Sequence, residues 1–180
     1  MTYFLIAVAV LAVISVFLYN GLVKLRNRVE NGWSQIDVQL KRRADLIPNL
    51  VESVKGYMQH EREVLERVTE ARTALMRSES PAQAAEADNQ LSGALKSLFA
   101  VSEAYPELRA SENFSKLQEE LSATENRVAY SRQAYNDAVY RYQNARQTLP
   151  SSIIAGIAGF EAREYYEVPE TDRSPVKVTF

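Results

Sequence analysis

Residues 1–23 carry no charged side chain, and the stretch from Tyr3 to Tyr19 is apolar apart from Ser15. In a helix that rises about 1.5 Å per residue, the two tyrosines stand about 24 Å apart, so their amphipathic rings can sit at opposite interfaces of a bilayer. The segment lacks the basic start and the small-residue cleavage site of a secretory signal, and a buried core helix rarely occupies the extreme terminus of a soluble domain. The pattern therefore predicts a membrane anchor over residues 1–23.

The next apolar positions follow one another at steps of three, four and seven residues, which is helical spacing. They are Leu22, Leu25, Val29, Trp33, Ile36, Leu40, Ile47, Val51, Val54, Met58, Leu65, Val68 and Leu75. A stripe on one helix needs partner helices to cover it. Pro48 interrupts the run, but the stripe keeps its phase across the proline, so we expect one kinked helix rather than a second helix capped by Asp45.

Two further long helices and a short one are predicted, separated by proline-containing turns. The second covers roughly residues 82–105, and the third covers residues 111–149. The third has the cleanest heptad stripe, formed by Phe114, Leu117, Leu121, Thr124, Val128, Ser131, Tyr135, Ala138, Tyr142, Ala145 and Leu149. Ser151 begins the short fourth helix, and residues 161–180 form an extended tail.

The stripe of the third helix raises two questions that the pattern leaves open. The hydroxyls of Thr124 and Ser131 either fix the register of the seam or bond to the preceding turn of their own helix. The third helix also outruns the second by about 22 Å at 1.5 Å per residue, so either the short fourth helix or another subunit must cover the overhang.

The predicted fold is therefore all-α. An N-terminal transmembrane helix (residues 1–23) continues into an elongated antiparallel bundle of three long helices and one short helix (24–160), followed by the tail (161–180).

Charges nearly balance over the whole chain, with 21 Lys and Arg against 23 Asp and Glu, so no nucleic-acid partner is expected. Bases are concentrated beside the anchor, where Lys24, Arg26 and Arg28 suit anionic lipid headgroups or serve topology alone. Because these bases follow the apolar span, the positive-inside rule predicts a cytoplasmic bundle. Membrane lipids are the first expected partner.

Polar residues on the first and third helices form a candidate network. Its members are Asp37, Arg42, Arg43, Asp45, Asn49, Glu120, Glu125 and Asn126, with Trp33 beside them on the apolar stripe. Two interpretations compete, a binding surface near the membrane and an interhelical set of ion pairs and hydrogen bonds that fixes the register. We favour the second, and for Trp33 a packing role.

The chain offers little material for catalysis. It has no cysteine and one histidine, His60, which cannot complete the Glu-x-x-His pairs of a carboxylate-bridged metal site. No nucleophile elbow, phosphate-binding glycine loop or dinucleotide fingerprint occurs in the sequence. We therefore expect no catalytic residues, no cofactor and no metal.

Two long motifs carry a family resemblance. The segments VENGWSQIDVQLKRRADLIPNLV (29–51) and YPELRASENFSKLQEELSATENRVA (105–129) closely resemble the LemA family. The resemblance implies a bacterial membrane-anchored protein with an antiparallel helical bundle, which places the anchor in the inner membrane. It implies no established enzymatic function.

Function is expected to reside in protein contacts. The leading hypothesis is a scaffold that self-assembles as a homo-oligomer, because long stripes and an overhanging helix offer more surface than one chain covers. The alternative is an adaptor that presents its bundle or tail to a membrane protease or signalling protein. In the tail, Val178 and Phe180 either dock on the bundle itself or add to the sheet edge of a partner, and we favour docking.

Overall fold

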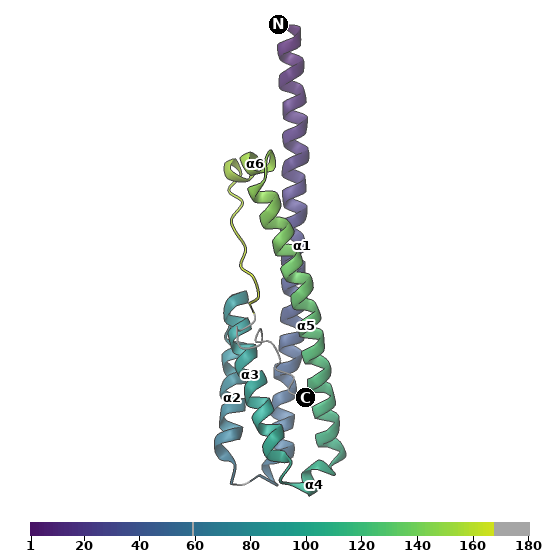
Figure 1. The fold of residues 1–180 in the computed structure, drawn as a ribbon, viewed down its shortest axis with the longest axis vertical. Coiled ribbons are helices and arrows are strands. Elements are labelled where there is room, and N and C mark those ends of the chain that lie inside the picture. The colour runs from purple at the N-terminus through teal and green to yellow at the C-terminus, as the bar shows by residue number, and fades with distance from the viewer. Residues whose placement is uncertain (59, 168–180) are drawn as a thin grey trace, which may run out of the picture.

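The structure, a computed structural model, describes residues 1–58 and 60–167, which form six helices and no strand (Figure 1). The predicted all-helical fold with an apolar N-terminal helix is confirmed. The helices are α1 (Thr2–Lys55), α2 (Arg62–Met76), α3 (Pro81–Ser102), α4 (Pro106–Arg109), α5 (Glu112–Gln147) and α6 (Ser151–Ile157).

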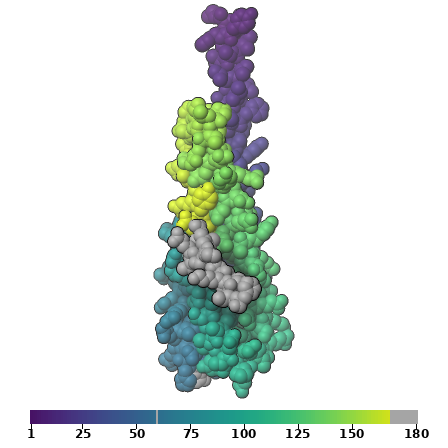
Figure 2. Space-filling view, in the orientation of Figure 1, coloured from purple at the N-terminus to yellow at the C-terminus, as the bar shows by residue number. Residues whose placement is uncertain are grey.

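The chain folds as a long rod. From its N-terminus α1 runs the whole length of the rod, α2 returns, α3 runs down again, and α5 climbs back antiparallel to α1 (Figure 1). The far end is thus a four-helix section made of α1, α2, α3 and α5, which we call the distal bundle. Closer to the N-terminus only α5, α6 and an extended segment accompany α1, and the first turns of α1 project alone (Figure 2). The extended segment, residues 158–167, is called the strap.

The predicted helix over residues 22–75 is wrong in one respect, because it is two helices rather than one. α1 ends at Lys55, and the amides of Tyr57 and Met58 both donate to the carbonyl of Val54, at 3.0 and 2.9 Å. Met58 is fully buried in this turn and closes the end of the core. The stripe gave no sign of the turn because the buried positions on both sides keep a helical spacing.

The prediction that α1 continues through Pro48 is confirmed. A proline has no amide hydrogen, so the carbonyl of Ala44, four residues earlier, loses its partner within the helix. In this structure the Nε of Arg72 on α2 donates to that carbonyl at 2.9 Å. The interruption in α1 is therefore satisfied by the neighbouring helix.

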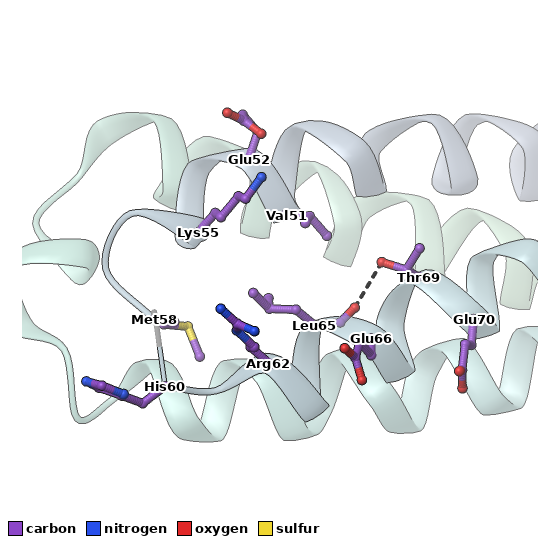
Figure 3. Close-up of a pocket in the computed structure, with 10 residues that line it drawn as sticks. All are labelled: Val51, Glu52, Lys55, Met58, His60, Arg62, Leu65, Glu66, Thr69 and Glu70. Atoms are coloured by element: carbon purple, nitrogen blue, oxygen red, sulfur yellow. Dashed lines mark hydrogen bonds between the residues drawn. The ribbon is translucent and has the colours of Figure 1, made fainter.

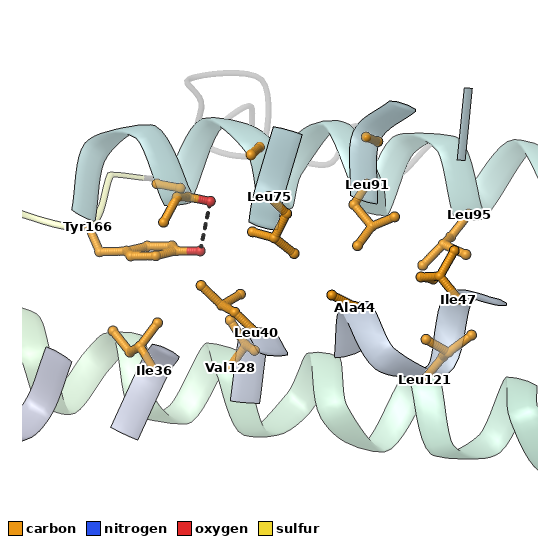
Figure 4. Packing of buried hydrophobic residues seen from close by; sticks show 14 of the residues in the cluster. Ile36, Leu40, Ala44, Ile47, Leu75, Leu91, Leu95, Leu121, Val128 and Tyr166 are labelled. Atoms are coloured by element: carbon orange, nitrogen blue, oxygen red, sulfur yellow. Dashed lines mark hydrogen bonds between the residues drawn. The ribbon is translucent and has the colours of Figure 1, made fainter. Parts of the chain in front are cut away.

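The core of the distal bundle lies between the facing stripes of α1, α3 and α5, as Figure 4 shows for Leu40, Leu91 and Val128. Most stripe residues of α5 are buried as predicted, but Leu149 lies outside the helix and is exposed. Thr124 is fully buried and its hydroxyl donates to the carbonyl of Leu121, so it bonds to its own helix.

The overhang of α5 is covered from within the chain. α5 has 36 residues against 22 in α3, so it extends past α3, and it packs along α1 (Figure 1). There α6 contacts both α1 and α5, and the strap turns back at Gly159, whose φ of 67° favours glycine. The short fourth helix folds back over the overhang, which is the first of the two predicted alternatives; the other was another subunit.

Candidate functional site

A buried ion pair lies at the centre of the distal bundle. Arg43 on α1 donates from Nη1 to Oδ1 of Asp88 on α3 at 2.6 Å, and the Arg43 side chain is only 1% exposed. Glu125 on α5 approaches the other guanidinium nitrogen at 3.5 Å. One arginine therefore joins three helices, and its charge is matched inside the protein rather than by water.

Tyr166 of the strap completes this centre. Its hydroxyl donates to Oδ2 of Asp88 at 3.2 Å, and its ring enters the core of the distal bundle (Figure 4). Burial raises the pKa of the Asp88 carboxyl, whereas the charge and hydrogen bond of Arg43 and the bond from Tyr166 oppose that rise. Burial and the adjacent Asp88 raise the pKa of Tyr166. The arrangement fastens the strap to the bundle.

Two pairs of adjacent α5 residues hold the strap backbone. The Tyr142 hydroxyl and the Gln143 amide donate to the carbonyls of strap residues 161 and 163, at 2.7 and 3.0 Å. One heptad earlier, the Tyr135 hydroxyl donates to the carbonyl of residue 164 at 2.8 Å. Asn136 exchanges two 3.0 Å hydrogen bonds with the backbone of Tyr166.

This spacing has a geometric cause. Seven helical residues rise about 10.5 Å, and three extended residues span about 10 Å. Tyrosine–amide pairs one heptad apart on a helix therefore have the same spacing as carbonyls three residues apart on an extended chain. Burial raises the pKa of Tyr135 to about 12 and also raises the pKa of Tyr142.

The predicted polar network is only partly brought together. Arg42 pairs with Glu120 across α1 and α5 at 3.0 Å, on the surface. Asp37 pairs with Lys41 of its own helix at 2.7 Å. Asp45, Asn49 and Asn126 are exposed, and their side chains make no hydrogen bond or ion pair with the other described residues. Trp33 is half-buried, and its ring lies 6.1 Å from that of Tyr135.

The predicted anchor residues lie along the free part of α1. Tyr3 is exposed, as are nearly all side chains up to Phe17, and this is the one helix in the described chain long and apolar enough to span a membrane. Tyr19 packs edge-on against Phe160 with ring centroids 5.7 Å apart, and the Arg26 guanidinium lies 5.6 Å from the same ring. Lys24 and Arg28 are exposed.

A groove of about 940 Å³ lies at the opposite end of the rod, between the end of α1 and the start of α2 (Figure 3). Val51, Leu65 and the fully buried Met58 are its apolar lining residues, with charged side chains on both sides. His60 is exposed at its edge. Within the described residues no group of histidines and carboxylates is placed to hold a metal ion.

Comparison with known proteins decides the family. The profile of the LemA family matches residues 32–180, which include the buried Arg43, Asp88 and Tyr166. The chain belongs to the LemA family. Protein LemA of Metamycoplasma hominis is 25% identical over 185 residues, covering 97% of this chain and 83% of that protein.

More distant similarity to this LemA-family chain covers part of its length. Magnetosome protein MamQ 2 of Paramagnetospirillum magneticum is 30% identical over 90 residues, and Magnetosome protein MamQ of Magnetospirillum gryphiswaldense is 28% identical over 90 residues. Each alignment covers 50% of this chain and 33% of the magnetosome protein. The similarity therefore concerns a shared segment rather than whole proteins.

Two functional features escaped the sequence analysis, and each had a signal. Asp88 stands in helical phase with the buried Ala84, Leu91 and Leu95, so it is a carboxylate within an apolar stripe. The tyrosine–amide pairs recur at a spacing of one heptad. The predicted tail contacts, Val178 and Phe180, lie outside the described residues.

Proposed function

We propose that this LemA-family protein is a non-catalytic scaffold, anchored in the bacterial inner membrane, that holds a rigid helical bundle at a fixed distance from the bilayer. One observation carries the proposal: α1 is a single helix of 54 residues that contains both the exposed apolar segment and one wall of the buried core. From Tyr19 to Lys55 it rises about 54 Å at 1.5 Å per residue. A joint-free connection of this kind transmits position and orientation.

The proposed location of the bundle is the cytoplasmic side. Lys24 and Arg28 lie within three turns of the end of the apolar segment and point to solvent, where the positive-inside rule expects the cytoplasmic face. The same bases favour contact with anionic headgroups, which makes lipids the first partner.

Self-assembly is supported by apolar and aromatic side chains on the outer faces of the rod. Tyr130 and Tyr140 on α5 are 77% and 63% exposed, and Val38 on α1 is 56% exposed. Large aromatic side chains contribute strongly to protein interfaces and are not needed on a surface that meets only water. We assign these faces to contacts between copies.

The mass of the assembly tests this proposal. The full chain is reconstituted in nanodiscs and compared with a shortened chain that begins at Lys24, both by mass photometry or native mass spectrometry. A discrete oligomer of the full chain supports the scaffold. A monomer in both forms contradicts self-assembly.

A second candidate, the adaptor, is favoured by the distal groove. This groove lies at the end of the rod farthest from the anchor, and its apolar floor suits a short amphipathic segment of a partner protein. A photo-crosslinking residue at Thr69, in the groove wall, tests it in cells. A crosslinked partner that disappears with Leu65→Glu supports an adaptor, and a crosslink only to the chain itself supports the scaffold.

A further inference from the structure

Three exposed aliphatic side chains lie at the end of the rod nearest the proposed anchor. Leu149, Ile153 and Ile157 are 76%, 56% and 80% exposed; Leu149 lies two residues before α6, and the two isoleucines lie within it, four residues apart. Residues four apart share one face of a helix, so Ile153 and Ile157 point the same way. On the other side of α6, Ala155 is buried in the core. The helix is therefore packed on one face and apolar on its free face.

The contacts of Phe160 locate this face along the axis of α1. Its ring contacts both Tyr19 and the Arg26 guanidinium, so Phe160, three residues after the end of α6, lies where the apolar part of α1 ends. α6 stands on the anchor side of that contact, alongside the apolar segment (Figures 1 and 2). Its free face thus lies at the same level along the α1 axis as side chains that the proposed anchor presents to lipid.

The exposed bases of α1 lie on the bundle side of this level. Lys24 and Arg28 are exposed on α1 about one to three turns beyond Tyr19 in the direction of the bundle, the depth at which lipid phosphates lie when tyrosine occupies the interface. α6 itself, Ser151–Ile157, contains no charged residue. The exposed aliphatic face of α6 suits the interfacial layer, where an apolar helix face is buried about 5–10 Å deep, and the nearby bases of α1 suit the lipid headgroups.

We propose that α6 together with Leu149 is a second membrane contact, which enters the interfacial layer of the bilayer that α1 crosses. We call this element the foot. The inference rests on the proposed anchoring and adds a specific consequence. An anchor alone leaves the bundle free to rotate about the axis of α1, whereas the foot fixes which face of the rod meets the membrane. The occupant of this apolar face is lipid rather than a second protein.

Depth-dependent fluorescence quenching tests the foot in the full chain. Because the chain has no cysteine, single labels are placed by Ile153→Cys and Ile157→Cys and carry a bimane group. Val10→Cys reports the anchor, and Met76→Cys is the matched exposed apolar control on α2. Proteoliposomes contain lipids brominated about 5–10 Å below the headgroups, the depth that interfacial helices reach. The fluorescence of Trp33 checks that each variant is folded.

The outcomes separate the two proposals. Quenching at positions 10, 153 and 157 that is several-fold stronger than at position 76 supports the foot. Strong quenching at position 10, with 153 and 157 no different from 76, overturns the foot and leaves the anchor in place. This second outcome also follows if another copy covers α6. No quenching at position 10 contradicts the anchor itself, and with it the foot.

Discussion

Arg72 should stabilise the protein mainly because Pro48 is present. The carbonyl of Ala44 lacks an intrahelical partner, Ala44 is fully buried, and the Arg72 Nε donates to its carbonyl at 2.9 Å. Removing one partner of a buried hydrogen bond costs about 1–3 kcal/mol, and bonds from charged donors lie toward the upper end. We therefore expect Arg72→Met, which keeps most of the aliphatic stem, to lower the free energy of unfolding by about 2 kcal/mol.

The same substitution should cost much less when the proline is replaced. In a Pro48→Ala background an amide at position 48 can donate to the carbonyl of Ala44, so Arg72→Met should cost about 0.5 kcal/mol and the coupling should be about 1–2 kcal/mol. The assay is urea unfolding of the full chain in mild detergent, followed by the fluorescence of the single tryptophan, Trp33. Arg67→Met, on the exposed side of the same helix, is the control and should cost less than about 0.5 kcal/mol in both backgrounds. An equal cost of Arg72→Met with and without the proline would refute the reasoning.

Three further predictions concern the buried ion pair and the strap. Asp88→Ala should lower stability by about 3–5 kcal/mol in urea unfolding because it strands a buried guanidinium, whereas Arg43→Met combined with Asp88→Leu should be far milder. Burial raises the pKa of Tyr135 from 10.0 to about 12, so stability should fall as the pH rises between these values, and Tyr135→Phe should flatten that fall in urea midpoints. Asn136→Ala, which removes both hydrogen bonds to the strap, should speed tryptic cleavage after Arg163.

Each of these has a clear contrary result. A double substitution as damaging as the single one would show that packing rather than the unpaired charge decides the cost. Parallel alkaline profiles for the wild type and the phenylalanine variant would remove that tyrosine from the titration. Unchanged cleavage would mean that the strap is held without the asparagine.

The helices of this protein were largely predictable from the sequence, because their evidence is local. The alternating stripe from Phe114 to Tyr142 predicted α5, and the phase kept across Pro48 predicted that α1 continues. The turn after Lys55 was missed because the buried Met58 keeps the helical spacing while the backbone reverses. Periodicity indicates which side chains are buried, and a continuous helix and a turn between two helices would bury the same ones here.

The buried centre was less predictable because its partners are distant in the sequence. Arg43 and Glu125 were candidates from the sequence. Asp88, however, lies 45 residues from Arg43, and Tyr166 lies 78 residues from Asp88. Only the packing of α3 and the return of the strap bring them together. A carboxylate in an apolar stripe indicates a buried partner, yet it does not identify that partner.

The rigid connection between anchor and bundle is the central claim, and a distance across it tests that claim most directly. Spin labels at Asn20→Cys and Lys55→Cys, in chains diluted with unlabelled protein in nanodiscs, are measured by pulsed electron paramagnetic resonance. One helix that continues from residue 20 to residue 55 predicts a single narrow distribution at about 52 Å, given a rise of 1.5 Å per residue. A broad or markedly shorter distribution would show a joint between the anchor and the bundle, and would contradict a scaffold that holds its bundle at a fixed distance from the membrane.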